Sequence, residues 1–453
     1  MKQRIYKTPR VLIKQFFVYY LLTLLPVLFL CYVTCHYEHA ESLLPLFFVE
    51  WTLVVAVFFS LCPWLGKKGV LFATVVFLLS FCVSAIVVRE SIVTYGAIWI
   101  GLDDLDYLNQ AANVVHSLHH SGWDLYETWT ELVSIGSGAW TLSGWPFLLG
   151  LVSSFVTSTA PLELLHAVAL SLNATFLTIV MALVYYILNQ RSRRSPRMVL
   201  FCFILLIGDP VIYTGRCLKE SLLQLVLMLA FVVCWKLPDR KRVLWGIVFG
   251  FSAFGIATTR VAYVPLILAV LYWRALERIR IGPTLRVVLG IVILALSARF
   301  LLQYEIRNVE VATFLKGTLE AETGLALSVY KIPLVGRLLY YLIVPVPSFP
   351  WQIFASTSFV TMMIRSIGSV AWFFATCYVL YGITRNRKLL KDGLFFAASF
   401  MFLGLFIAGA LSGADWRYKQ STNFYLAMML FITWYDSRKL RQAMGVPKGP
   451  YAV

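Results

Sequence analysis

Three aspartates, Asp103, Asp104 and Asp106, stand close together directly after the third long apolar stretch of the chain. Carboxylates at a membrane edge are costly to place there and often have a function. A carboxylate in dry surroundings can act as a general base that takes the proton of a hydroxyl group. It can also bind a divalent cation such as Mg²⁺ or Mn²⁺, because hard cations prefer oxygen ligands. The alternative is a solvated loop whose acidic residues have no chemical role.

A second polar group, made of Arg216, Lys219 and Glu220, lies between two later apolar stretches. If the segment is helical, spacings of three and four residues place the three side chains on one face. Two neighbouring cations can bind a phosphate, and arginine does so with two parallel hydrogen bonds. The alternative is an ion pair between Arg216 and Glu220, with Lys219 extending to the membrane surface.

Isolated cations follow further along the chain. Arg260 lies between two apolar stretches and needs an anionic partner, either one of the first carboxylates or a ligand phosphate. Arg417 and Lys419 flank Tyr418 and can bind an anionic head group or the face of a sugar. An aromatic belt with cations that reach the membrane surface is the other interpretation of that segment. The His-x-x-His-His run at 116–120 has no completing metal motif, and we expect it to be solvated.

Composition indicates an integral membrane protein. Of the 453 residues, 60% are hydrophobic and only 13% are charged, whereas soluble domains carry about 25% charged residues. The net charge of +17 is distributed over short basic clusters at the ends of apolar stretches, and no run resembles a nucleic-acid-binding module. We therefore expect membrane lipids as partners and no nucleic acid. None of the 8 cysteines has CxxC spacing, so neither a disulfide framework nor a zinc site is indicated.

Apolar stretches that match the hydrocarbon thickness of a bilayer predict about twelve membrane spans. We expect them near 16–34, 45–65, 69–88, 163–189, 198–215, 218–235, 243–259, 261–273, 286–303, 367–383, 393–412 and 421–436. The pair around Arg260 is short and suggests a tight or broken hairpin. With these crossings every basic cluster falls on one side of the membrane. The positive-inside rule assigns that side, and both termini, to the cytoplasm.

The sequence predicts one all-α transmembrane bundle over residues 1–453, with two large external loops. The first loop, 89–161, contains the apolar segment 144–158. A crossing at this segment would place the basic cluster 191–197 outside, so we expect an interfacial or re-entrant helix instead. The second loop, 304–366, is also expected to hold an interfacial helix.

An acidic group in the first external loop, followed by interfacial helices and by cations at later external junctions, resembles the GT-C superfamily of integral membrane glycosyltransferases. Asp103 and Asp104, followed by Tyr107 and later by the segment Gly144–Phe147, are similar to the first loop of that family. The chain departs from the family in one respect. We count three spans before Asp103, where the family commonly has one.

The resemblance implies transfer of a sugar from a polyprenyl-phosphate carrier to a glycan, lipid or protein acceptor on the non-cytoplasmic face, and we expect a bacterial inner membrane. It implies that Asp103 or Asp104 removes the acceptor proton in an inverting displacement. It indicates no specific cofactor, although Mg²⁺ or Mn²⁺ could assist. The residues expected to bind the substrates are Asp106, Arg216, Lys219, Glu220, Arg260, Arg417 and Lys419.

Two other functions remain open at this stage. An O-antigen-type polysaccharide polymerase or ligase would also use external arginines and a large late loop, and its catalysis would depend on Arg260 or the cations of 304–366 rather than on Asp103. A secondary transporter or flippase would suit an even number of spans. Transporters, however, place their polar groups near the middle of the membrane, often in two related halves.

Overall fold

The structure is a computed structural model of the chain. The described residues are 43–61, 67–95, 102–135, 143–191, 216, 217, 219–236, 242–260, 359–411 and 420–443, with scattered residues between 14 and 28 and between 263 and 342. Within these residues the chain is helical and has no strand. The prediction of an all-α fold is therefore confirmed for this part of the chain.

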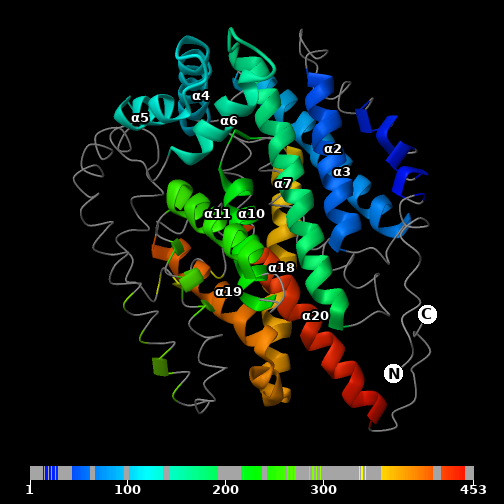
Figure 1. The fold of residues 1–453 in the computed structure, drawn as a ribbon. Helices are drawn as coiled ribbons and strands as arrows, with labels where there is room; N and C mark the ends of the chain where they lie inside the picture. Colours follow the sequence, from blue (N-terminus) through cyan, green and yellow to red (C-terminus); the bar gives the residue numbers. More distant parts are fainter. Residues whose placement is uncertain are drawn as a thin grey trace.

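The helices are given with the labels of Figure 1. Their bounds are α2 Leu44–Leu61, α3 Lys67–Tyr95, α4 Leu102–His120, α5 Leu125–Ile135, α6 Gly144–Ser154, α7 Leu162–Arg191, α10 Glu220–Lys236, α11 Arg242–Arg260, α18 Phe359–Arg385, the 3-10 helix η5 Arg387–Lys391, α19 Gly393–Leu411 and α20 Gln420–Ala443.

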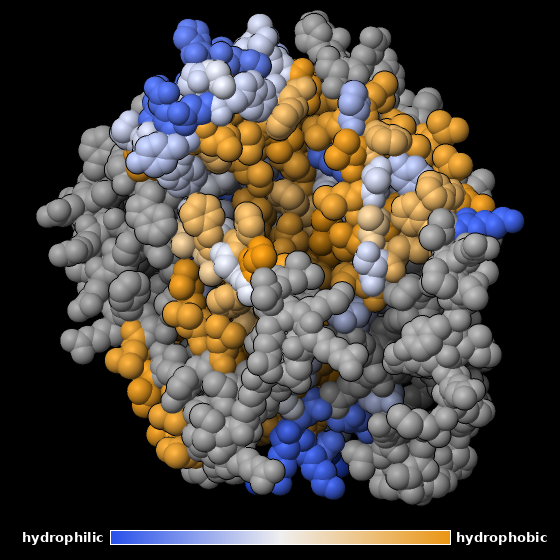
Figure 2. Space-filling view, viewed as in Figure 1, coloured by the Kyte–Doolittle hydropathy of each residue, from blue (hydrophilic) through white to orange (hydrophobic). Residues whose placement is uncertain are grey.

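Three of these helices are long and apolar enough to cross a membrane, namely Leu44–Leu61, Leu162–Leu188 and Ile367–Arg385. Helix α2 and the second half of α18 expose large apolar side chains, as expected for lipid-facing surfaces. Figure 2 shows hydrophobic surface across the middle of one face and hydrophilic surface over α4 and α5 at one end. The membrane character predicted from composition is thus borne out, and the count of about twelve spans stays a prediction.

Helices α4, α5 and α6 gather at one end of the molecule (Figure 1). A tight turn joins α4 to α5, with Gly122 and Trp123 in the left-handed region at φ 65° and 72°. Asp124 then begins α5, because its Oδ1 accepts the backbone N–H groups of Tyr126 at 2.9 Å and of Glu127 at 3.0 Å. Helix α6 has 11 residues and is about 16 Å long, so it is too short to cross a membrane, as predicted for 144–158.

Helix α7 lies at the centre of the described helices. Its residues 164–185 are all buried inside the protein, and the helix packs against α2, α3, α4, α6, α10 and α20. The helix also carries polar side chains in its first half. Ser171, Asn173 and Thr175 are each at most 1% exposed. Because lipid does not reach these groups, the neighbouring helices must satisfy them.

Several predicted boundaries differ from the structure. Helix α3 continues to Tyr95 rather than ending near residue 88, and α18 begins at Phe359 rather than near 367. Both extensions carry polar residues, which a hydropathy window excludes although the backbone hydrogen bonds continue. The predicted span 198–215 and the loop segment 304–335 lie outside the described residues.

Candidate functional site

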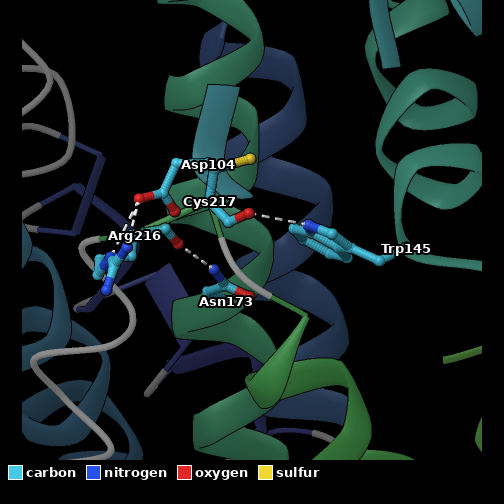
Figure 3. A network of polar contacts seen from close by, with 5 residues as sticks. All are labelled: Asp104, Trp145, Asn173, Arg216 and Cys217. Carbon is cyan, nitrogen blue, oxygen red and sulfur yellow. Dashed lines mark hydrogen bonds and ion pairs between the residues drawn. The ribbon is translucent and has the colours of Figure 1, made fainter. Parts of the chain in front are cut away.

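The site is built around a turn that precedes α10. Trp145, the second residue of α6, donates its indole Nε1–H to the carbonyl oxygen of Cys217 at 3.2 Å. Asn173 of α7 donates its Nδ2–H to the carbonyl oxygen of Arg216 at 2.9 Å. Two consecutive carbonyl groups are therefore fixed by side chains from two different helices (Figure 3). These two hydrogen bonds fix the position of the backbone from which the Arg216 side chain extends.

Arg216 pairs with Asp104, which lies 112 residues earlier in the chain. The guanidinium Nε–H and Nη2–H both donate to Asp104 Oδ2, at 3.0 and 2.8 Å (Figure 3). The Asp104 side chain is 1% exposed and that of Arg216 is 15% exposed. The pair thus joins the first turn of α4 to the start of α10, and its cationic partner reaches the surface.

Lys219 and Glu220 follow in the same segment and are 9% and 5% exposed. Lys219 Nζ lies over the ring of Tyr107, 5.6 Å from its centroid, in a cation–π arrangement. The expected placement of Arg216, Lys219 and Glu220 on one helical face is wrong, because α10 begins only at Glu220 and Arg216 and Lys219 lie in turns. The turn directs Arg216 to Asp104 instead.

The buried thiol of Cys217 lies next to this pair (Figure 3). Burial raises the pKa of the Cys217 thiol well above its usual value, and the negative charge of Asp104 raises it further. The thiol therefore stays protonated at neutral pH and is a poor nucleophile. In the described part of the site, the charged groups are the candidates for chemistry.

The N-terminus of α6 packs against the C-terminal turn of α11. Gly144 lies so close to Thr258 that a side chain at this position would meet its hydroxyl group and its Cβ. Two residues later α11 ends at Arg260, whose guanidinium Cζ lies 5.6 Å from the ring centroid of the buried Tyr263. Arg260 therefore lies on the helix end that adjoins Trp145 and, through it, the turn of Arg216.

The other predicted residues have different positions. Asp106 is on the exposed face of α4, away from the face of Asp104. Asp103 belongs to the first turn of α4, but its side chain is not among those described, and Arg417 and Lys419 also lie outside the described residues. His116, His119 and His120 are exposed.

No group of three His, Cys, Asp or Glu side chains within the described residues is placed to hold a metal ion. Asp104 directs Oδ2 to the guanidinium of Arg216. The suggested Mg²⁺ or Mn²⁺ thus has no ligand set in this part of the chain, and no step proposed below is routed through a metal.

Sequence reasoning missed three residues of this region. Asn173 and Glu50 are polar residues inside predicted spans, which is itself a signal of function or of a specific partner. Glu50 Oε1 of α2 lies 3.0 Å from Ser171 Oγ of α7, at hydrogen-bond distance. Trp145 belongs to the segment Gly144–Phe147 noted above, but nothing in its spacing indicates a hydrogen bond to Cys217.

The chain matches no protein-family model, no curated protein and no solved structure.

Proposed function

We propose that the protein is an integral membrane glycosyltransferase that moves a sugar from a polyprenyl-phosphate carrier to a glycan, lipid or protein acceptor. The observation that carries the proposal is the contact between Asp104 and Arg216 at 2.8 Å. It brings an acidic group of the first loop to a basic turn that lies 112 residues later. A transferase of this kind needs a carboxylate for the acceptor hydroxyl and cations for the departing phosphate in one place.

The topology of the proposal has about twelve spans, with both termini in the cytoplasm and α4 to α6 on the non-cytoplasmic face of a bacterial inner membrane. Helix α10 begins at Glu220, beside Arg216, and ends at Lys236. The basic end of α10 at Lys236 therefore lies about 24 Å along the helix axis from the end at Glu220. Helix α11 runs the opposite way, from basic Arg242 to Thr258 beside Gly144. This arrangement supports opposite membrane faces for the cytoplasmic clusters and the site.

The reaction is an inverting displacement. Asp103 or Asp104 takes the proton of the acceptor hydroxyl, the oxygen attacks the anomeric carbon, and the bond from that carbon to the phosphate oxygen breaks. Polyprenyl phosphate leaves with the bonding electron pair. Arg216 stabilises its charge together with Lys219, while Arg260, Arg417 and Lys419 complete the anion site. A guanidinium has five N–H donors, and two of those of Arg216 bind Asp104.

The two carboxylates have different places in this scheme. Asp104 is held by Arg216 and almost completely buried. Arrival of a phosphate at Arg216 would compete with Asp104 for the guanidinium and make the carboxylate available to the acceptor. Binding of the donor would thereby release the general base that acts on the acceptor hydroxyl. Asp103 is the alternative base, with Asp104 then positioning Arg216.

The decisive experiment uses purified full-length protein in liposomes with polyprenyl-phosphate-linked sugars and candidate acceptors. We expect Asp103→Asn or Asp104→Asn to lower the turnover rate by roughly 10²- to 10⁴-fold, the contribution of a general base. Arg216→Lys keeps the charge but loses the planar, multi-donor geometry of the guanidinium, and we expect it to raise the KM for the donor. Glu131→Gln is the matched control, because this carboxylate is exposed on the neighbouring helix α5.

Two results would contradict the proposal. Full activity in both Asp103→Asn and Asp104→Asn, with loss of glycan polymerisation in Arg260→Ala, would indicate a polymerase or ligase. Accumulation of a soluble solute driven by an ion gradient, without sugar transfer, would indicate a transporter.

A further inference from the structure

A second carboxyl group lies inside the helix bundle, on another side of α7. Glu50 of α2 is 4% exposed, and its Oε1 lies 3.0 Å from Ser171 Oγ, at hydrogen-bond distance. Thr175 follows one helical turn later and is 1% exposed. Its hydroxyl also faces the Glu50 carboxyl, although without the geometry of a hydrogen bond. Helices α2 and α7 pack side by side along this contact (Figure 1).

The number of hydrogen atoms available to Glu50 and Ser171 limits which hydrogen bonds they can form at the same time. Ser171 Oγ lies 3.0 Å from Glu50 Oε1 and 2.9 Å from the carbonyl oxygen of Val168. A hydroxyl group has one hydrogen, and an ionised carboxylate has none to donate. Both contacts are hydrogen bonds at the same time if Glu50 carries a proton and donates it to Ser171, while Ser171 donates to Val168. Thr175 Oγ1 and Glu50 Oε2, buried and without a hydrogen-bond partner among the described residues, can then pair through a small rotation.

The surroundings of Glu50 supply no compensating charge. Within the described residues its carboxyl group has no cationic partner, and an unpaired carboxylate buried in a membrane bundle is strongly unfavourable. The titratable side chains described on the elements that pack against α2 are not bonded to Glu50 either. They are Lys14, Tyr20, Cys82, Glu163, His166, Tyr185 and Tyr186. A bound proton removes the charge with no other change in the structure.

We propose that Glu50, Ser171 and Thr175 form a proton-binding site in the interior of the bundle. The ligand is a proton, held on Glu50 at neutral pH and shared with the hydroxyl group of Ser171. The site is independent of the glycosyl transfer proposed above. The carboxylate of Asp104, in contrast, is balanced by Arg216 and needs no proton.

The test uses dicyclohexylcarbodiimide, which enters membranes and reacts with protonated carboxyl groups. The acid O–H adds across one N=C bond of the reagent, and the adduct rearranges to a stable N-acylurea on the carboxyl carbon. The full-length protein in liposomes is treated at neutral pH, digested and mapped by mass spectrometry. We expect the adduct on the Glu50 peptide, with less labelling as the pH rises, and no adduct on the ion-paired Asp104 in the same digest.

Infrared spectroscopy makes the outcome independent of whether the reagent reaches the site. A protonated carboxyl group has a carbonyl stretch that is separate from the bands of a carboxylate. The difference spectrum between wild type and Glu50→Gln should contain this stretch at neutral pH. Its absence overturns the proposal. Its presence without an adduct still supports a bound proton and shows only that the reagent is excluded.

A metal cation is the competing occupant, since a carboxylate and two hydroxyl groups also suit Na⁺. Labelling is therefore repeated in sodium chloride and in choline chloride. Equal labelling in the two salts supports the proton, and protection by sodium overturns the assignment. Glu50→Gln keeps the shape of the side chain and donates an N–H to Ser171, so we expect it to fold and serve as the unlabelled control.

Discussion

Two buried carboxyl groups lie on different sides of α7, and their surroundings differ in charge. On the side of Asn173, Asp104 is paired with Arg216 at 2.8 Å, and the guanidinium reaches the surface. On the side of Ser171 and Thr175, Glu50 is buried, and the polar groups that face it within the described residues are hydroxyl groups. A carboxylate with a cation can stay charged when buried, whereas one among hydroxyl groups is stable when neutral. The first arrangement suits a substrate anion that exchanges partners, and the second suits a fixed contact between helices.

The largest predicted effect comes from removing Arg216, the cation that pairs with Asp104. Arg216→Ala leaves Asp104 as an uncompensated buried charge, and such losses cost roughly 3–5 kcal/mol. We expect the free energy of unfolding in mixed detergent micelles to fall by this amount and sugar transfer to be lost. The double variant Arg216→Ala with Asp104→Ala should recover part of the stability but none of the activity. No recovery in the double variant would mean that Asp104 is not the charge that Arg216 balances.

Replacing the carboxyl group by an amide at Asp104 and at Glu50 compares the two positions directly. Asp104→Asn removes the negative partner of Arg216, and losing a hydrogen-bonded charge at a buried position costs roughly 1–3 kcal/mol. Glu50→Gln replaces a neutral acid with a neutral amide of the same shape, so we expect a loss below about 1 kcal/mol. Unfolding of the two variants in parallel measures the difference. Equal losses would show that Glu50 is charged in the folded protein.

A third prediction concerns the packing of α6, the helix that contacts the turn of Arg216 through Trp145. In Gly144→Ala the new methyl group would meet Thr258, and overpacking of this kind costs about 1–3 kcal/mol. Gly250→Ala in α11 is the matched control, since nothing lies within 4 Å of the new atom. Alanine there should be neutral or stabilise the helix by up to about 1 kcal/mol. Thermal unfolding of both variants in detergent checks the contrast.

A smaller effect is expected from the indole contact. Trp145→Phe keeps an aromatic ring against α7 but removes the N–H group that binds the Cys217 carbonyl. Loss of one such hydrogen bond costs about 1 kcal/mol. Because the turn then holds Arg216 less firmly, the KM for the donor should rise more than the stability falls. An unchanged KM with reduced stability would show that Trp145 is structural only.

The smallest effect is predicted for Glu131→Gln on the exposed face of α5. Surface substitutions usually change stability by less than about 0.5 kcal/mol. We expect unchanged unfolding and unchanged sugar transfer. Substantial loss of transfer would place the acceptor on the exposed side of α5.

Part of this arrangement could be predicted from the sequence. Charged residues in a chain with 13% charged residues are conspicuous, so Asp104, Arg216 and Lys219 stand out at the ends of apolar stretches. Hydropathy also gives the all-helical membrane class and the short helix near 144–158. These features depend on local composition, which a single sequence records.

The pairing of these residues could not be predicted. Asp104 and Arg216 are 112 residues apart, and Trp145 and Cys217 are 72 residues apart. Such contacts depend on how helices pack, and helical periodicity does not encode that. The helical face expected for Arg216 was wrong for a related reason. The turn before α10 is fixed by Asn173 and Trp145 from other helices, and this tertiary constraint outweighs local helix propensity.

The burial of residues 164–185 of α7 has a consequence for biogenesis. As a lone helix in lipid, α7 would expose the amide of Asn173 and the hydroxyl groups of Ser171 and Thr175 to acyl chains. Partners for these groups come from α2, made earlier by the ribosome, and from the start of α10, made later. Residues 162–188 should therefore depend on both neighbours for stable insertion, and a nascent chain that stops before Arg216 should be a substrate for membrane quality-control proteases.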